Sequence, residues 1–340
     1  MKKYYLSLLV SCLLFTSLPI QKASANKIST DISRQNLYET METFTGIPWY
    51  YLAAMDQYER NNQSLKKSKN PDEKKKLIAI KVPTYLWAGL LNPSPDEQSP
   101  FVIQLFQGIG IDGDGDGKAD VHNDLDVLYT IARYLSQNGI AEDQIRNQLW
   151  SYYQHPTAVD VITHMAKVYH TFGTLKLSDE SFPIPLNYNY SYRSTWGDRR
   201  GWGGLRIHEG TDIFAGYGTP VLSTCYGYVE LMGWNRFGGW RVGIRDLKNR
   251  YHYFGHLNGF RKGLKPGQVV KPGDVIGSVG SSGYGPPGTS GKFPPHLHYG
   301  IYRFNGKNTY SFDPYPLLRK WEREAVQKQK EKRKQKRTAH

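Results

Sequence analysis

Three short segments between residues 208 and 298 carry the side chains best suited to hydrolytic chemistry. They read His208-Glu209-Gly210-Thr211-Asp212, Tyr251-His252-Tyr253-Phe254-Gly255-His256-Leu257 and His296-Leu297-His298. A catalytic Zn²⁺ takes three protein ligands from imidazole, carboxylate or thiolate groups and keeps a fourth position for water, whose pKa falls to about 7. The segments supply these groups, so we interpret the region as a catalytic zinc site.

The spacing of these residues indicates how their side chains could converge. His296 and His298 are two apart on an expected strand, so both leave the same face and can reach one metal ion. His208 and Asp212 flank a glycine at the entry to another expected strand, and His256 ends a third. Taken alone, the residues leave two alternatives open, namely ordinary core or surface histidines and a groove that has lost its metal.

In this order on one strand-rich domain, the motifs closely resemble those of the lysostaphin-type or LytM-type zinc endopeptidases, which cut peptide bonds in bacterial peptidoglycan. The resemblance extends from about Trp196 to Pro316. It implies three zinc ligands, which are His208, Asp212 and His298. It also implies two catalytic histidines that move protons and stabilise the tetrahedral intermediate, which are His256 and His296.

Two features have no counterpart in that family. His252 has no assigned role, and we expect it at the surface or in support of a ligand. The loop from Gly283 to Pro295 is longer than the short Ser-Thr-Gly-Pro segment that the family commonly carries before its His-x-His motif. Because this loop should border the substrate groove, it leaves the preferred cleavage site open.

The periodicity of apolar residues predicts an α+β protein with several domains. Helical patterns cover residues 28–60, 124–138, 143–153 and 158–171, whereas short runs from residue 191 onward alternate with Gly, Pro and Asn turns, as in an antiparallel sheet. We therefore expect an all-α domain over residues 26–173, a Pro- and Asn-rich linker over 174–190, a mostly antiparallel β metallopeptidase domain over 191–318 and a basic tail over 319–340.

The helical region also resembles a known fold. Gly46-Ile47-Pro48, Leu52-Ala53-Ala54 and the Gly-rich stretch from Gly110 look like the lytic-transglycosylase-like domain related to goose-type lysozyme. That resemblance makes Glu59 a candidate acid and base, but the family's Glu-Ser pair is Glu59-Arg60 here and its late Tyr-Asn is Tyr153-Gln154. The alternative is that Glu59 pairs with Arg60 or a nearby lysine, in a domain that binds or positions the cell wall without catalysis.

An alternating run of aspartates and glycines begins at residue 112. The spacing matches the first half of a calcium-binding loop, in which carboxylates converge and a glycine permits the turn. The candidate ligands are Asp112, Asp114, Asp116 and Asp120. Asn123 stands where a bidentate glutamate is expected, so a solvated series of Asx–Gly turns is the alternative to a structural Ca²⁺.

Considered as a whole, the chain resembles the sporulation L-alanyl-D-glutamate peptidases of endospore-forming bacteria. The stretch from Trp196 to Trp202 carries part of this likeness. The expected function is therefore a secreted zinc metalloendopeptidase that hydrolyses peptide bonds in peptidoglycan stems or cross-links, including L-Ala-D-Glu in the spore cortex. A non-catalytic cell-wall scaffold and a lytic transglycosylase using Glu59 are the alternatives.

Charge and the first residues point to an exported protein. Residues 1–25 have the order of a signal peptide that ends at Ala23-Ser24-Ala25, and Cys225 is then the one remaining thiol, so no internal disulfide is expected. The formal charge is +14, with ten basic and three acidic residues from Arg319 onward. Peptidoglycan, teichoic acid and an anionic membrane surface are the expected partners, and nucleic acid is not expected for an exported chain.

Overall fold

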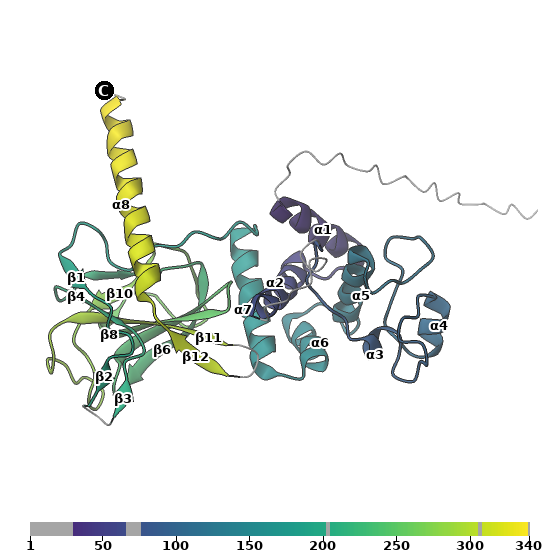
Figure 1. Ribbon diagram of the computed structural model, residues 1–340, viewed down its shortest axis with the longest axis horizontal. Coiled ribbons are helices and arrows are strands. Elements are labelled where there is room, and N and C mark those ends of the chain that lie inside the picture. The colour runs from purple at the N-terminus through teal and green to yellow at the C-terminus, as the bar shows by residue number, and fades with distance from the viewer. Residues whose placement is uncertain (1–29, 66–75, 202–204, 305–307, 339–340) are drawn as a thin grey trace, which may run out of the picture.

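The computed structural model describes residues 30–65, 76–201, 205–304 and 308–338. The expected signal peptide over residues 1–25 lies outside these ranges. Figure 1 shows helices at one end of the molecule and strands at the other, with helix α7 between them. None of the described helices is long and apolar enough to cross a membrane.

The N-terminal half is helical, as its periodicity predicted. Its helices are α1 (Thr30–Thr45), α2 (Trp49–Leu65), α3 (Thr84–Trp87), α4 (Pro100–Leu105), α5 (Asp124–Ser136), α6 (Glu142–Tyr153) and α7 (Pro156–Phe172). Gly46 ends α1 because its φ of +76° suits a residue without a Cβ, and Pro48 cannot continue the helix. Leu52, Leu128 and Ile162 are fully buried at the centre of the bundle.

A buried carboxylate ties the first two helices together. Asp56 is inaccessible to solvent and accepts hydrogen bonds from the Tyr38 hydroxyl at 2.7 Å and from Arg60 Nε at 2.8 Å. Arg34 lies 3.3 Å from the same carboxylate. Because a buried charge is tolerated only when it is paired and hydrogen-bonded, this cluster fixes how α1 packs on α2.

The second half is an antiparallel sheet that carries the candidate site. Its strands are β1 (Tyr190–Tyr192), β2 (Arg199–Arg200), β3 (Arg206–Ile207), β4 (Thr211–Ala215), β5 (Pro220–Leu222), β6 (Gly227–Asn235), β7 (Gly239–Asp246), β8 (Arg250–Phe260), β9 (Val269–Val270), β10 (Val275–Val279), β11 (His296–Phe304) and β12 (Thr309–Phe312). The main sheet runs β1-β4-β11-β8-β7-β6-β9, while β10 pairs with β5 and β8, and β12 pairs with β11. The helical and antiparallel halves of the expected fold class are both present.

The contact between the halves is specific. The ring of His164 on α7 stacks on Tyr228 of β6 at a centroid distance of 3.9 Å, and its Nδ1 lies 3.0 Å from Glu230. Arg245 on β7 holds the same carboxylate from Nε at 2.9 Å. Asn61 adds a bond to the carbonyl of Leu247 at 2.9 Å. These polar contacts give α7 a defined position on the sheet, away from the strands that carry the histidines.

The segment interpreted as a linker packs on the sheet. Phe182 and Ile184 are buried in the β-domain core, and Glu180 forms an isolated bridge with Cys225. Cys225 is a buried free thiol. The composition of this stretch predicted a linker, and the structure adds that Phe182 and Ile184 belong to the same core cluster as Leu318 and Trp321 of helix α8 (Tyr315–Thr338).

Helix α8 contains the described part of the basic tail that the sequence predicted over residues 319–340. Trp321 is 1% exposed in the β-domain core, and its Nε1 donates to Glu180 at 2.9 Å. The hydroxyls of Tyr190 and Tyr192 donate to Glu322 at 2.7 and 2.8 Å. Few residues of this helix are apolar, but the helix still reaches the core of the β domain. Leu318 and Trp321 suffice because they are three apart and lie on one helix face.

Trp321→Ala tests this anchoring. We expect the stability of the β domain to fall by about 3–5 kcal/mol, because the change leaves a cavity and removes the donor to Glu180. Hydrogen exchange of the β11 amides measures the stability of this domain separately. Gln327→Ala is the control, since Gln327 lies on the exposed part of α8 and bonds only Glu331 among the contacts described. Equal protection in both variants would contradict the anchoring role.

Candidate active site

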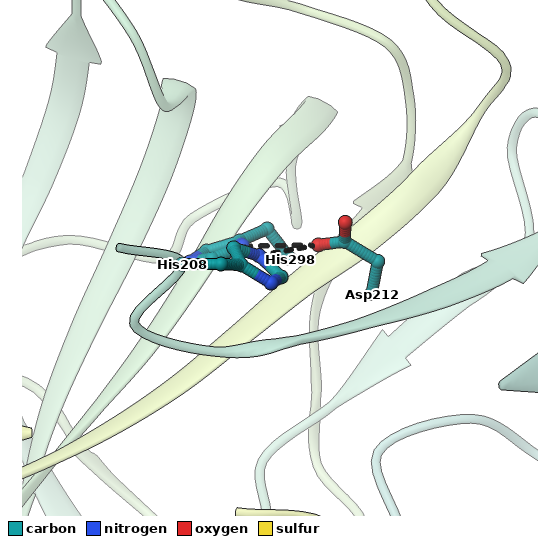
Figure 2. A group of neighbouring side chains, drawn as sticks. All are labelled: His208, Asp212 and His298. Atoms are coloured by element: carbon teal, nitrogen blue, oxygen red, sulfur yellow. Dashed lines mark hydrogen bonds and ion pairs between the residues drawn. The ribbon is translucent and has the colours of Figure 1, made fainter. Parts of the chain in front are cut away.

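The register of three adjacent strands brings the expected metal-binding residues together. On β11, His298 lies directly opposite Asp212 of β4 and, on its other side, opposite Gly255 of β8. His208 precedes β4 and is 4% exposed, while Asp212 is 5% exposed. Figure 2 shows the rings of His208 and His298 side by side, with one oxygen of Asp212 directed at them.

The atoms that meet here are of the kind that binds a metal. His208 Nδ1 lies 2.7 Å from the carbonyl of Thr195, to which it can only donate, so His208 Nε2 carries a lone pair. That Nε2 lies 2.9 Å from His298 Nδ1 and 3.1 Å from Asp212 Oδ1, and His298 Nδ1 lies 3.0 Å from the same oxygen. Three such atoms in contact need a shared proton or a cation between them, so the donor set fits Zn²⁺.

The ionisation states also suit a metal site. Burial acts to raise the pKa of Asp212, but hydrogen bonds from His208 and His298 outweigh it and hold that pKa well below its usual range. Burial lowers the pKa of His298, although Asp212 opposes the shift. The carboxylate is therefore charged and the imidazole neutral at neutral pH, which are the forms that coordinate metals.

Arg200 and Gly210 support this arrangement. Arg200 was not among the expected site residues, and Gly210 was noted only as the glycine between His208 and Asp212. Arg200 pairs with the Asp212 oxygen that does not face the histidines, which orients the carboxylate. A Cβ on Gly210 would lie 2.7 Å from His298 Cε1 and 2.6 Å from the carbonyl oxygen of Tyr299. Glycine is therefore required between His208 and Asp212. The spacing of that motif was visible in the sequence, but the close approach to His298 was not.

Two further imidazoles face the same space. His256 Nδ1 lies 2.8 Å from the Ser282 carbonyl, and His296 Nδ1 lies 2.8 Å from the Pro294 carbonyl. Each Nδ1 must therefore donate, and each Nε2 is left as an acceptor in the neutral ring. The two ring centroids are 4.8 Å apart. Burial, followed by the neighbouring His296 and His298, lowers the pKa of His256 well below its usual value, so this ring can accept a proton at neutral pH.

A bulge aims His256 at the site. The sequence placed this residue at the end of a strand, but β8 continues to Phe260. The register between β7 and β8 shifts between Trp240 and Val242, and His256 has a φ of +60°, which is unusual for a residue with a side chain. Bulges redirect a side chain without ending the strand, and this one turns His256 toward the cavity.

These residues line one cavity of about 520 Å³. Its wall includes all five predicted site residues, the aromatic rings of Tyr253, Tyr284 and Phe293, and the cations of Arg200, Arg206 and Arg241. Phe293 and Tyr284 come from the long loop that the sequence placed beside the substrate groove. The cavity is large enough for a few residues of an extended peptide, and the expected metal ligands His208, Asp212 and His298 are part of its wall.

His252 lies away from this cavity, and its expected surface position is wrong. The residue is completely buried, with Nε2 3.1 Å from Asp246 and Nδ1 2.7 Å from the Tyr299 hydroxyl. Tyr299 alternates with His298 on β11, so His252 belongs to the opposite, core-facing side of the sheet. Cys225, Asp246 and His252 also approach one another closely enough to hold a metal, but Arg250 already binds this carboxylate from Nε at 2.7 Å.

The aspartate loop is held mainly by backbone hydrogen bonds. Asp112 accepts from the amides of Gly115 and Gly117 at 2.7 and 2.8 Å, and the buried Asp126 accepts from Gly113 and Asp120 at 2.8 Å each. The structure groups Asp112 and Asp114 with Asp126, and not with the expected Asp116 and Asp120. This pattern favours the series of Asx–Gly turns over a calcium loop.

Glu59 contacts an aromatic residue that the sequence did not point to. Arg60 binds Asp56, four residues earlier, whereas Glu59 accepts a hydrogen bond from the Tyr153 hydroxyl at 2.8 Å. Burial and the nearby Glu59 raise the pKa of Tyr153 well above its usual value, so the phenol keeps its proton and remains a donor. Because Tyr153 packs against Tyr58, Glu59 stabilises the junction of α2 and α6.

Gly210→Ala tests whether close approach of this backbone is required. We expect zinc affinity to fall about ten- to hundredfold, as for other changes that displace a ligand without removing it. Competition with a chromophoric chelator measures the affinity. Gly216→Ala is the control. Gly216 directly follows strand β4, and a Cβ there would meet nothing nearer than the Thr219 hydroxyl at 3.7 Å. If both variants bind zinc like the unchanged protein, the close approach has no role.

Comparison with known proteins agrees with this geometry. Residues 206–314 match the model of peptidase family M23. Lysostaphin of Staphylococcus simulans is 34% identical over 116 residues, which cover 33% of this chain and 22% of that protein. The crystallised catalytic domain of lysostaphin covers 39% of this chain and 93% of its own, at 30% identity and a TM-score of 0.32.

A longer alignment joins the whole chain to one relative. The L-Ala–D-Glu endopeptidase of Bacillus subtilis (strain 168) is 58% identical over 310 residues, which cover 91% of this chain and 94% of that protein. The likeness therefore includes the helical half as well as the sheet. At this identity and coverage, the chain belongs to peptidase family M23 and is a metalloendopeptidase, as its motifs predicted.

Proposed function

We propose that this protein is a secreted zinc endopeptidase that hydrolyses the L-Ala–D-Glu bond in peptidoglycan stem peptides. The observation that carries the proposal is the convergence of His208 Nε2, Asp212 Oδ1 and His298 Nδ1 at the floor of a cavity that two more imidazoles face. The choice of L-Ala–D-Glu as the bond that is cleaved is supported by the 58% identical relative, which is an L-Ala–D-Glu endopeptidase. Action on peptidoglycan agrees with the lysostaphin-like relatives.

The five predicted site residues have different proposed roles in catalysis. His208, Asp212 and His298 would hold Zn²⁺, which when bound polarises the scissile carbonyl and lowers the pKa of water. His256 Nε2 then accepts the proton of the attacking water and passes it to the leaving amine. Burial lowers the pKa of His296, although the charge of Asp212, 3.7 Å away, opposes the shift. We assign His296 the hydrogen bond to the developing oxyanion, which its Nε2 can donate once the ring has taken up a proton.

The remaining expectations concern where the protein acts and what it touches. Export through the segment at residues 1–25 fits a substrate outside the membrane. The exposed part of α8 from Lys328 onward carries most of the basic residues of the tail, and it could contact teichoic acid or an anionic membrane surface. Such a contact would weaken as salt screens the charges.

We propose that the helical half is related to the lytic-transglycosylase-like domains and acts in binding. Glu59 holds a structural hydrogen bond with Tyr153, so we assign it no catalytic role. In the aspartate loop, carboxylate oxygens of Asp112 and Asp126 accept hydrogen bonds from backbone N–H groups, and we therefore assign no Ca²⁺ to it. We therefore propose a helical domain that binds or positions the cell wall.

Digestion of purified peptidoglycan tests the peptidase. Mass spectrometry of the products should show new amino termini at D-Glu that disappear with a chelator and return with added zinc. We expect His298→Ala to lose both zinc and activity, and His256→Ala to keep zinc while kcat falls about 10²- to 10⁴-fold, as for loss of a general acid–base group.

Glu59→Gln is the matched test of the helical half. It should leave product formation unchanged, because the amide still accepts a hydrogen bond from Tyr153. Anhydro-sugar ends that persist with chelator and vanish in Glu59→Gln would instead assign glycan cleavage to this domain. Absence of any product from zinc-loaded protein would favour a non-catalytic scaffold.

A further inference from the structure

Two arginines in the active-site cavity have no carboxylate partner. Arg206 and Arg241 both line the cavity, and among the residues that the structure describes no Asp or Glu forms an ion pair with either. Other arginines of the β domain are paired with carboxylates, as Arg245 is with Glu230 and Arg250 is with Asp246. Unpaired guanidinium groups in a concave site are suited to an anionic ligand.

One aromatic ring separates Arg241 from the cluster of expected metal ligands. It projects from β7 opposite the bulge of β8, and its guanidinium carbon is 6.0 Å from the centre of the Tyr253 ring. The Tyr253 ring in turn meets His298 edge-on at 5.7 Å. The Nε of Arg241 is buried without a hydrogen-bond partner, and no described carboxylate forms an ion pair with this guanidinium, so its charge remains available.

Arg206 approaches the same space from the other side. Its guanidinium donates to the Tyr284 hydroxyl at 2.5 Å and lies 5.2 Å from the centre of the Phe237 ring. Tyr284 is stacked against His256 at 6.1 Å. Each arginine is therefore one ring away from an imidazole of the site, Arg241 from His298 and Arg206 from His256.

The other charges of the cavity do not neutralise these two. Arg200 and Asp212 pair with each other. One further carboxylate lies in the wall, Glu209, which accepts a hydrogen bond from the Tyr302 hydroxyl at 3.2 Å. A single carboxylate can offset at most one of the two cations. Apart from the metal-binding cluster itself, the cavity thus presents an excess of positive charge immediately beside the position where a scissile bond would lie.

We propose that Arg206 and Arg241 bind the free carboxylate of an acidic residue on the leaving side of the scissile amide, which makes them specificity-determining residues. This inference rests on the proposed function and narrows its substrate class. A glutamyl residue has two carboxyl groups, of which one continues the peptide and the other is free. Whichever group is free, it lies only two to four bonds from the leaving nitrogen, within the space between the arginines and the metal ligands.

Arg206 and Arg241 should therefore distinguish a substrate with a free carboxylate from the same substrate with that carboxyl group amidated. A carboxylate can accept bidentate, charge-assisted hydrogen bonds from guanidinium groups, whereas a primary amide offers one acceptor oxygen and adds N–H groups that face a cation. The same stem peptide with this carboxyl amidated should be a poorer substrate. The discrimination should appear mainly in KM, because the contact is present in the bound substrate as well as in the transition state.

Two matched peptides test the proposal. Both contain L-Ala–D-Glu within the same stem sequence, one with the second carboxyl free and one with it amidated, and kcat/KM is measured with the full-length, zinc-loaded protein. We expect at least tenfold preference for the free carboxylate. Arg241→Gln and Arg206→Gln should each lower kcat/KM for the free peptide about tenfold and change the amidated peptide by less than about twofold. Lysine at either position should restore part of the preference.

The controls separate this inference from folding and from the proposed function. Arg236→Gln removes an exposed arginine outside the cavity wall and should alter neither peptide. Zinc content and melting temperature exclude misfolding, and Arg206, an exposed position, supplies the test if the Arg241 variant is unstable. Equal cleavage of both peptides by the unchanged protein, or an unchanged ratio in both glutamine variants, would refute the carboxylate site while the peptidase stands. Cleavage of neither peptide would refute both.

Discussion

The structure depends on holding two imidazole nitrogens and a carboxylate oxygen in contact where solvent is largely excluded. His208, Asp212 and His298 contribute these atoms within 4.8 Å of one another. Such a cluster is unfavourable unless a cation or proton is shared, so rigid elements must maintain it. The sheet provides this rigidity, because His298 and Asp212 are direct partners across β11 and β4, and Gly210 and Arg200 fix the approach of the third ligand and the orientation of the carboxylate.

One strand joins this chemistry to the stability of the domain. On β11, His296 and His298 face the cavity, whereas Leu297 and Tyr299 are fully buried in the core. Behind Tyr299, a buried network extends from His252 through Asp246 and Arg250 to Glu180, which Trp321 of α8 also binds. A one-residue slip of β11 would exchange the two faces, so the core contacts that fix its register also fix the ligands.

The sequence was sufficient where chemistry depends on local spacing. The shared strand face of His296 and His298 and the long helices follow from periodicity, whereas the choice of zinc ligands followed from the resemblance to the lysostaphin-type enzymes. It was insufficient where a partner comes from a distant segment. The bulge that turns His256 depends on pairing with β7, and the burial of Trp321 depends on Glu180. Asp126 likewise replaced Asp116 near Asp112 because a helix start, not the loop itself, supplies the buried carboxylate.

The two sets of positive charge in this chain have different physical consequences. The basic side chains of α8 from Arg323 to Lys336 are exposed, so their attraction to polyanions is general and decreases with ionic strength. Arg206 and Arg241 both lie in a concave wall beside aromatic rings, and Arg241 is also partly buried, so water and counterions have less access to Arg241. A charge held in such a place interacts more strongly with a fixed anion than a mobile surface charge does. Substrate selection therefore depends on these two cavity arginines, and the formal charge of +14 says little about it.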